Sequence, residues 1–382
     1  MKVLVFPRDG QNPYQRLLYA EMERLGARIS YLGRLTPSRT LNLLLLPLET
    51  AIRGAGGTCL IHLHWVFGFG LPGDRRIPGL RRLAQVWFTL WLRAVHLLRI
   101  PLVWTAHNVL PHAPVFADDI AARRALVAAS DLVVAHCHSA LNGLASIGAV
   151  PQRYAIIPHG PLATVIPPAE LRMPGTGSEP RHVLFFGKIL DYKGVEDLLA
   201  AFQALPGDLA IRLTVAGQCD DAELRARLHE LAQADRDRVL LRLERIAEPD
   251  VAPLLMSADV VALPYRRVTT SGSAMLALAY GRPLILPELA EFGHLPRQAI
   301  IGFGGTQQAL TVALKQVACA AGPTLTDMGI AASAYAATLS WRDIATKTQG
   351  EMICLLRGQY PASRQNDETV QEKHLVRDSQ SG

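Results

Sequence analysis

The sequence has 382 residues, of which 49 % are hydrophobic and 19 % charged. This composition is typical of a globular protein and excludes a disordered chain, and the length exceeds what one hydrophobic core usually supports, so two domains are expected. The formal net charge of +6 suits an anionic substrate or a membrane surface, but no lysine-rich tract or nucleic-acid motif indicates nucleic-acid binding.

Cysteine usage and the N-terminus both favour a cytoplasmic location. An odd number of isolated thiols without metal-ligand spacing is typical of a reducing compartment. The first ten residues, MKVLVFPRDG, are predicted to form a strand, because the apolar run is too short for a signal peptide and no small-residue cleavage site follows. The cysteines are Cys59, Cys137, Cys219, Cys319 and Cys354.

The first half of the chain alternates between strand and helix patterns. Strands separated by helices indicate βαβ units, and therefore a parallel sheet covered on both faces. Strands are expected at Lys2–Phe6, Arg28–Leu32, Cys59–His64, Leu102–Ala106, Leu132–Ala135 and Tyr154–Pro158. Helices are expected at Pro13–Gly26, Leu41–Arg53, Gly79–Leu98 and Asp118–Ala129, with a short one from Ser139.

The region Leu80–Trp104 raises the question of membrane contact. Its apolar run is interrupted by arginine too early to span a bilayer. A helix with aromatic residues and arginines could lie on the cytoplasmic face of an anionic membrane, although a buried helix between two strands is the more common case.

The second half repeats the alternation after a Pro- and Gly-rich stretch that we interpret as an interdomain linker. We expect an N-terminal domain at 1–165, a linker at 166–181, a C-terminal domain at 182–340, a helix at 341–358 that packs back toward the first domain, and a disordered tail at 359–382. Strands are expected at Val183–Phe186, Arg212–Ala216, Val239–Leu243, Val260–Leu263, Pro283–Leu286 and Ala299–Gly302. Helices are expected at Val195–Leu205, Asp221–Ala234, Asp250–Ser257, Ser273–Tyr280, Thr306–Ala321, Thr324–Leu339 and Trp341–Arg357.

Two loops of the second half have the parts of a phosphate or diphosphate site. The first follows strand Val183–Phe186 and contains Gly187, Lys188, Lys193 and Gly194 before a helix. Glycines allow close approach of the backbone, a helix start offers free N–H groups, and lysines supply positive charge. An ordinary turn with solvated lysines is the alternative.

The second loop leads from Tyr265 through Arg266 and Arg267 to a cluster of hydroxyl residues that opens a helix. Capping alone would need only one of Thr270, Ser271, Gly272 and Ser273, so the pair of loops favours a diphosphate ligand. Neither loop is a Walker motif, and no strand is followed by GxGxxG.

Histidines follow the expected strands of the first half. Because parallel strands end at one edge of a sheet, we expect these side chains to face the same rim, where they could hydrogen-bond hydroxyls or phosphate oxygens, or one could act as a general base. Each alone is more often structural, and the spacing gives a metal site little support. The residues are His64 with Trp65, His107 with Asn108, His136, His138 and His159; Asp9, Asn12 and Tyr14, in the loop after the first strand, belong to the same rim. Asp9 is a possible base or sugar ligand, while Asn12 and Pro13 also fit a helix start.

The segments GKILDYKGVEDLLAAF (187–202), ADVVALPY (258–265) and the run from Gly272 to Pro283 resemble the donor domain of GT-B glycosyltransferases close to family 4. In the first half, NPYQRLL, HLHWVF, VWTAHN and IPHG are similar to the acceptor domain of bacterial exopolysaccharide transferases such as the xanthan β-mannosyltransferase group. The resemblance covers about residues 1–357. It implies transfer of a sugar from a GDP- or UDP-linked donor, for instance GDP-mannose, to a saccharide or lipid-linked acceptor, without a metal or other cofactor.

The resemblance also implies roles for individual residues. Lys188 and Lys193 would neutralise the leaving diphosphate, and Thr270, Ser271 and Gly272 would hold its oxygens. Residues from Ile246 to Asp250 would line the base and ribose pocket, and His107 would lie beside the donor sugar.

One departure from the family concerns two glutamates that retaining members carry eight residues apart. Val268 and Leu276 occupy these positions. This favours an inverting relative in which His107 or Asp9 would deprotonate the acceptor hydroxyl. Two other functions stay open: a catalytically silent homologue that binds a nucleotide sugar or a partner enzyme, and a sugar-nucleotide epimerase of the same fold.

Overall fold

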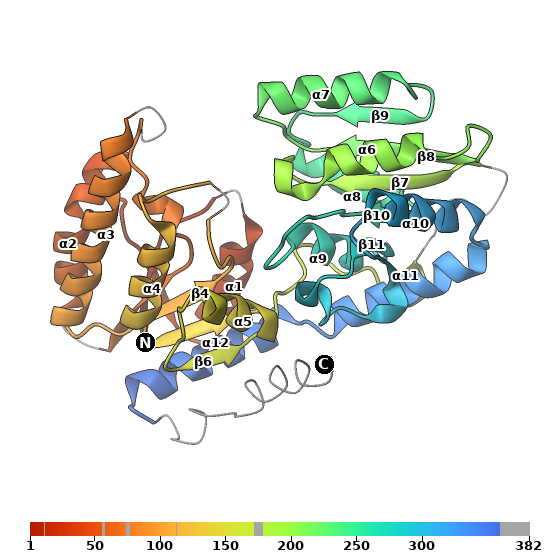
Figure 1. Cartoon of the computed structure of the whole chain (residues 1–382). Coiled ribbons are helices and arrows are strands. Elements are labelled where there is room, and N and C mark those ends of the chain that lie inside the picture. Colours follow the sequence, from red (N-terminus) through yellow and green to blue (C-terminus); the bar gives the residue numbers. More distant parts are fainter. Residues whose placement is uncertain (11, 56–57, 74–76, 112, 172–178, 360–382) are drawn as a thin grey trace, which may run out of the picture. The chain divides into compact units, whose positions relative to one another are not determined.

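The chain forms two compact units in a computed structural model that describes residues 1–10, 12–55, 58–73, 77–111, 113–171 and 179–359. One unit comprises residues 1–158 and the chain from 342 onward, and the other comprises 159–341. Among the described residues, each unit contains one six-stranded parallel sheet with helices packed against it (Figure 1). The predicted α/β fold with two doubly wound units is confirmed.

The first unit is built on a sheet with the strand order β2-β1-β3-β4-β5-β6. Strands β3, β4 and β5 are buried along their whole length, as expected for parallel strands covered on both faces. The strands are β1 (Lys2–Phe6), β2 (Arg28–Tyr31), β3 (Cys59–Leu63), β4 (Leu102–Ala106), β5 (Leu132–Ala135) and β6 (Tyr154–Ile156). The helices are α1 (Pro13–Arg24), α2 (Arg39–Gly54), α3 (Pro78–Leu97), α4 (Asp119–Ala129), α5 (His138–Ser146) and most of α12 (Trp341–Leu356), with a 3₁₀ turn η1 (Val66–Phe69).

Helices α2, α3 and α4 pack side by side on this unit (Figure 1). Phe88 and Trp91 of α3 lie in the core, and the Trp91 indole donates a hydrogen bond to Thr50 Oγ1 of α2 at 3.1 Å. Helix α3 is therefore buried on one side only, whereas the sequence also allowed a fully buried helix. Within the described ranges, no helix is long and apolar enough to cross a bilayer.

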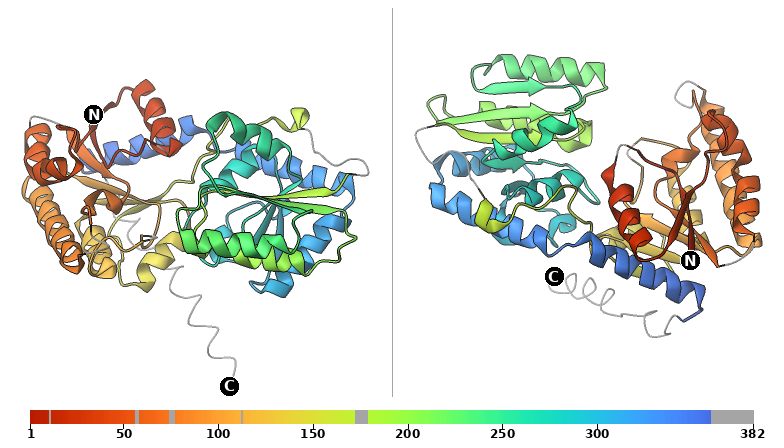
Figure 2. Two further views of the ribbon diagram at one scale, coloured as in Figure 1. Left: turned by 90° about the horizontal axis from the view of Figure 1, so that it is seen from above. Right: turned by 180° about the vertical axis from the view of Figure 1, so that it is seen from behind.

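The second unit is built on a sheet with the strand order β12-β11-β10-β7-β8-β9. Helix α6 packs against α7 and α10, and α9 packs against α11, so that helices cover both faces of the sheet (Figure 2). The strands are β7 (Arg181–Phe186), β8 (Ile211–Ala216), β9 (Val239–Arg242), β10 (Val260–Ala262), β11 (Leu284–Pro287) and β12 (Ile300–Phe303). The helices are α6 (Val195–Gln203), α7 (Ala222–Gln233), α8 (Glu248–Met256), α9 (Gly272–Ala279), α10 (Gln307–Cys319) and α11 (Gly322–Ala337). Short 3₁₀ turns are η2 (Pro168–Glu170), η3 (Asp191–Lys193), η4 (Ala290–Phe292) and η5 (Arg297–Ala299).

Each sheet has a switch point, where successive strands are added on opposite sides of one central strand. In the first sheet, β2 and β3 lie on opposite sides of β1, and in the second, β8 and β10 lie on opposite sides of β7. Ligands of doubly wound sheets bind outside the carboxyl ends of the strands at such a point. This topology selects the loops after β1 and β3 in the first unit, and those after β7 and β10 in the second.

The boundary between the units lies earlier than the end of the expected first domain at residue 165. Residues 159–165 belong to the second unit, where Pro161 O accepts the Trp341 indole N–H at 2.7 Å and Ile166 N donates to Ala279 O at 2.9 Å. From Arg342, helix α12 belongs to the first unit, and the side chain of Gln349 donates to Leu25 O at 3.1 Å. Much of the expected linker (172–178) and the expected disordered tail (360–382) lie outside the described residues.

Candidate functional site

The two predicted anion-binding loops of the second unit meet at Gly187. This residue has φ +137°, and a Cβ added to it would lie 2.6 Å from Ser273 Oγ and 3.1 Å from Lys193 Nζ. Ser273 lies at the start of α9 and Lys193 at the end of η3. The Ser273 hydroxyl and the Lys193 ammonium are therefore both within about 3 Å of the position that a Cβ of residue 187 would occupy, which we call the Gly187 point. A glycine is required there, both for its backbone conformation and for the space.

The loop after β7 is held in shape by a second glycine and by an arginine. Gly194 has φ +66°, and a Cβ on it would lie 2.1 Å from Pro264 O, so the turn packs directly against the end of β10. Arg266 binds both carboxylate oxygens of Asp197 at 2.8 and 3.0 Å and also contacts Asp191. The sequence predicted that Arg266 would add positive charge for a ligand. In the structure its guanidinium binds two aspartates, Asp191 and Asp197, and so joins the two loops.

The start of α9 shows which of its hydroxyls serve the fold. Ser271 Oγ accepts the N–H of Ala274 at 3.1 Å as the helix cap and donates to the Tyr265 hydroxyl at 3.2 Å. Tyr265 is buried, and its ring lies 5.4 Å from Lys193 Nζ. Ser271 and Tyr265 therefore position the site, while Ser273 is the hydroxyl that lies beside Lys193.

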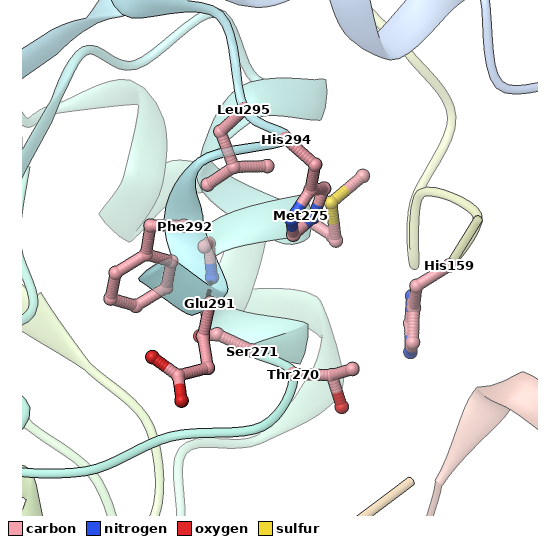
Figure 3. Close-up of a pocket in the computed structure, with 9 residues that line it drawn as sticks. His159, Thr270, Ser271, Met275, Glu291, Phe292, His294 and Leu295 are labelled. Atoms are coloured by element: carbon pink, nitrogen blue, oxygen red, sulfur yellow. Dashed lines mark hydrogen bonds between the residues drawn. The ribbon is translucent and has the colours of Figure 1, made fainter. Parts of the chain in front are cut away.

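A pocket of the second unit opens next to the cap of α9 (Figure 3). His159 Nδ1 donates to Gly160 O at 2.7 Å, and burial lowers the pKa of His159 to about 4, so that its imidazole is neutral at pH 7. Glu291, from the η4 turn after β11, brings a carboxylate to the pocket that sequence reasoning missed; its place after a strand end was the only signal. The lining residues are His159, Thr270, Ser271, Ala274, Met275, Glu291, Phe292, His294 and Leu295.

Other residues predicted for the donor side make contacts away from Lys193 and Ser273. Lys188 is exposed and pairs with Asp220 at 2.8 Å. Ile246, in the loop after β9, packs against the hydrophobic core of the unit. Val268 and Leu276, at the positions of the family glutamates, also pack against this core, so their apolar character is accounted for by packing.

In the first unit, buried histidines and a tyrosine form one continuous hydrogen-bonded chain, which we call the histidine chain. His62, His64, His107, His136 and Tyr19 are each at most 6 % exposed. The contacts are Thr105 Oγ1 to His62 Nε2 (2.7 Å), His62 Nδ1 to the Tyr19 hydroxyl (2.8 Å), that hydroxyl to His64 Nε2 (2.6 Å), His64 Nδ1 to His107 Nε2 (2.9 Å), His107 Nδ1 to His136 Nε2 (3.2 Å), and His136 Nδ1 to Ile157 O (2.9 Å).

The carbonyl at the end of the chain fixes every tautomer. A neutral imidazole has one N–H donor and one acceptor nitrogen, and Ile157 O can only accept. His136 must therefore donate from Nδ1 and accept at Nε2, which makes His107 a donor at Nδ1 and an acceptor at Nε2. His64 takes the same tautomer, and so the Tyr19 hydroxyl donates to it.

Burial keeps two imidazoles of this chain, those of His62 and His64, neutral. Burial lowers the pKa of His62 to about 3 and that of His64 well below its usual value of 6.5. Both ring nitrogens of His107 form hydrogen bonds with neighbouring histidines. Its Nε2 accepts from His64 Nδ1, and its Nδ1 donates to His136 Nε2. The two histidine contacts of His107 place it in the middle of the chain.

The other predicted residues of this unit surround the chain. Tyr14 is buried with its ring against His107 (centroids 4.7 Å apart), so it supports the chain. Trp65 stacks on His107 at 4.6 Å, and Phe67 stacks on Trp65 at 5.8 Å and is 44 % exposed. This aromatic row leads from the histidine chain to the surface at the end of β3.

The loop after β1 presents a carboxylate. Asp9 Oδ1 accepts the N–H of Asn12 at 3.2 Å, and Asn12 caps α1 through the N–H of Tyr14. This loop lies at the carboxyl end of β1, where the topology of the first sheet predicts ligand binding. Asn108 lies in the loop after β4.

The expectation that all the histidines face one rim is corrected in two respects. His138 is exposed at the first position of α5, and His159 belongs to the second unit, because the chain leaves the first sheet at residue 158. Within the described part of the chain, no group of three or more His, Cys, Asp and Glu side chains could hold a metal ion.

Comparisons with known proteins agree with this geometry. Residues 180–316 match the model of the family described as Glycosyl transferases group 1. A search of curated proteins gave no match. Sucrose-phosphate synthase from Thermosynechococcus elongatus is similar in structure, with a TM-score of 0.69 and 16 % identity over 94 % of this chain and 99 % of that one.

HepE from Anabaena is similar as well, in two solved complexes. The complex with UDP has a TM-score of 0.65 and 16 % identity, covering 92 % of this chain and 99 % of that one. The complex with UDP-glucose has a TM-score of 0.64 and 14 % identity, covering 92 % and 100 %. Identities this low establish the fold, while the family model matches the unit that contains the Gly187 point. The chain therefore has the GT-B fold, and residues 180–316 of its second unit match the group 1 glycosyltransferase model.

Proposed function

We propose that the protein transfers a sugar from a nucleoside diphosphate sugar to a hydroxyl group of a saccharide or lipid-linked acceptor. The observation that carries this proposal is the convergence of Lys193 Nζ and Ser273 Oγ beside Gly187, at the switch point of the second sheet. In the reaction, the acceptor oxygen bonds to the anomeric carbon, the bond from that carbon to the diphosphate breaks, and the acceptor proton passes to a base.

The leaving diphosphate is the part of the donor that these loops suit. Lys193 supplies a positive charge, Ser273 a hydroxyl, and the start of α9 backbone N–H groups, all of which stabilise negative charge that grows as the bond breaks. We propose that these groups bind the diphosphate without a metal ion. Lys188 would reinforce them after release from Asp220, a half-exposed pair that costs little to break.

We assign the hydroxyl groups of the donor to the pocket beside α9. Glu291 supplies the carboxylate that Val268 and Leu276 do not, and Thr270 and neutral His159 line the same pocket. Carboxylates and neutral imidazoles are suited to hydrogen bonds with sugar or ribose hydroxyls. We propose that Ile246 and the loop that follows it bind the nucleobase of the donor.

For the acceptor side we propose Asp9 as the general base and the aromatic row as the acceptor platform. Asp9 lies in the loop after β1, at the switch point of the first sheet, whereas both ring nitrogens of His107 bind neighbouring histidines. Trp65 and Phe67 offer flat apolar faces against which a sugar ring can stack. His64, Tyr14 and Asn12 would then hold these groups in place, and Asn108 would contact the substrate.

The nucleotide is proposed to be UDP or GDP. HepE was solved with UDP and UDP-glucose, which makes UDP the first nucleotide to test. A polysaccharide or glycolipid product, as in exopolysaccharide synthesis, and a site of action on the cytoplasmic face of a membrane belong to the same proposal.

Replacement of Lys193 tests the donor site. We expect Lys193→Ala to lower turnover of the donor by about 10²- to 10³-fold, the usual cost of removing one group that stabilises developing charge, while circular dichroism and the thermal midpoint stay unchanged. Lys315→Ala, which removes an exposed lysine of α10 in the same unit, is the matched control and should leave turnover unchanged.

The product distinguishes transfer from the other two functions. A transferase releases one nucleoside diphosphate for each acceptor molecule that is glycosylated. An epimerase converts the donor to an isomer when no acceptor is present. A protein that binds UDP or GDP through Lys193 but turns over no donor with any acceptor would be a silent homologue. Unchanged turnover in Lys193→Ala would refute the assignment of the diphosphate site.

A further inference from the structure

Helix α2 exposes a row of large aliphatic side chains. Leu41, Leu44, Leu48 and Ile52 follow each other at intervals of three or four residues, so they lie on one side of the helix. These side chains are 44–66 % exposed. Single exposed leucines are ordinary on a protein surface, but a row along a whole helix is not.

Helix α3 exposes a second row of the same kind. Leu83, Val86, Leu90 and Leu97 are 46–80 % exposed, while Phe88 on the opposite side of the helix is fully buried. The pattern is that of an amphipathic helix with an additional apolar strip on its outer side. Core packing accounts for the inner strip and leaves the outer one unexplained.

The two rows form one surface, which we call the α2/α3 face. The indole of Trp87 donates to Leu43 O at 3.0 Å, and that of Trp91 donates to Thr50 Oγ1 at 3.1 Å. Because both contacts advance in the same direction along the two helices, α2 and α3 run side by side and roughly parallel, as Figure 1 shows. At 1.5 Å per residue, the pair extends over roughly 25–30 Å.

The charge of the α2/α3 face has one sign. Helix α3 contains no acidic residue, and Glu49, the acid of α2, is 2 % exposed and accepts the N–H of Gly33 at 2.7 Å. Arg82, Arg93 and Arg99 are exposed at α3 and its end. In the part of the chain that the structure describes, none of these three has a carboxylate at salt-bridge distance.

We propose that the α2/α3 face docks on a lipid bilayer that contains anionic lipids, with both helices lying in the plane of the interface. Aliphatic side chains would enter the acyl boundary, and the arginines would contact the anionic headgroups. A second copy of the chain fits less well, since two such faces would bring arginines together with no exposed acid to pair with them. The inference does not depend on the proposed transfer reaction.

Binding of the full-length protein to vesicles tests this surface. We expect sedimentation with vesicles of phosphatidylcholine containing 30 % phosphatidylglycerol, and at least tenfold weaker binding to phosphatidylcholine alone. The variant L48E/L90E, with one change in each row, should bind the anionic vesicles at least tenfold more weakly. The control L240E/V312E places the same charges on exposed apolar positions of the second unit and should bind as the wild type does.

A second variant separates the charged part of the contact from the apolar part. R82Q/R93Q should weaken binding to anionic vesicles several-fold and reduce its dependence on salt, with less effect on neutral vesicles. Equal binding by L48E/L90E and the wild type, or no binding by the wild type, would overturn the proposal. A dimer that only L48E/L90E dissociates, in sedimentation velocity without lipid, would overturn it in favour of a second copy.

Discussion

The histidine chain shows how one backbone group determines the protonation of several side chains. Ile157 O cannot donate, so each imidazole from His136 to His62 donates at Nδ1 and accepts at Nε2. The chain has one direction and cannot reverse, because reversal would need a proton on the carbonyl. It is thus suited to hold Trp65 and Tyr14 rather than to carry protons.

The sequence could predict only part of this chain. His64, His107 and His136 follow strands, and parallel strands end at one edge, so their proximity was predictable. His62 and Tyr19 were not predicted, because their contacts depend on the register of β3 with β4 and on how α1 crosses the sheet. Register comes from tertiary packing, which a single sequence does not display.

The buried histidines predict a loss of stability in acid. Above pH 6.5 they are neutral in both the folded and the unfolded state, and so contribute no pH dependence. Below it the unfolded chain takes up protons that buried His62 (pKa about 3) and His64 do not, so the free energy of unfolding falls by about 1.4 kcal/mol per pH unit for each. Urea unfolding between pH 7.5 and 5 should show this decline.

The variant His62→Gln isolates one of these contributions. It should reduce the slope of unfolding free energy against pH by about 1.4 kcal/mol per unit below pH 6.5, whatever stability it loses at pH 7.5 from its hydrogen bonds. His138→Gln, which changes an exposed histidine of the same unit, should keep the slope. Equal slopes in wild type and His62→Gln would show that His62 is not buried as a neutral group.

At the scale of elements, the predicted strands and helices were confirmed to within a few residues at their ends, because alternating apolar runs and caps are local signals. The convergence of the β7 loop with the start of α9 followed from topology alone. The position of Glu291 could not be predicted in this way. Glu291 reaches the pocket through the η4 turn after β11, and the path of this turn depends on side-chain packing and not on a repeated sequence pattern. The same holds for η3, a single 3₁₀ turn between β7 and α6.

Gly194 predicts the sensitivity of the β7 loop to a single methyl group. Gly194→Ala would place a Cβ 2.1 Å from Pro264 O in a left-handed conformation, so we expect a loss of about 2 kcal/mol or more in unfolding free energy and weaker nucleotide binding. Gly207→Ala, at an exposed position in the same unit with no heavy atom within 4 Å of the added Cβ, should change stability by less than about 0.5 kcal/mol. Equal stabilities of the two variants would contradict the close packing of the turn.

At the scale of the whole molecule, the two units have separate hydrophobic cores. The core around β7 and β10 involves residues of the second unit, and that around α2, α3 and β3 involves residues of the first. The change from strand–helix alternation to a Pro- and Gly-rich stretch was enough to predict two domains. It could not place residues 159–165, whose assignment rests on the hydrogen bonds of Pro161 and Ile166.

Separate cores predict that a donor nucleotide stabilises one unit selectively. The proposed diphosphate site lies wholly within residues 159–341, so UDP at about 100 times its Kd should stabilise this unit by about 2.7 kcal/mol, which shifts its calorimetric midpoint by on the order of 5–10 °C. Gly194→Ala and His62→Gln, each confined to one unit, identify the two transitions. Lys193→Ala should abolish the shift and Lys315→Ala should retain it. GDP in place of UDP compares the two nucleotides by the same measurement, whereas an equal shift of both transitions would mean that the nucleotide binds elsewhere.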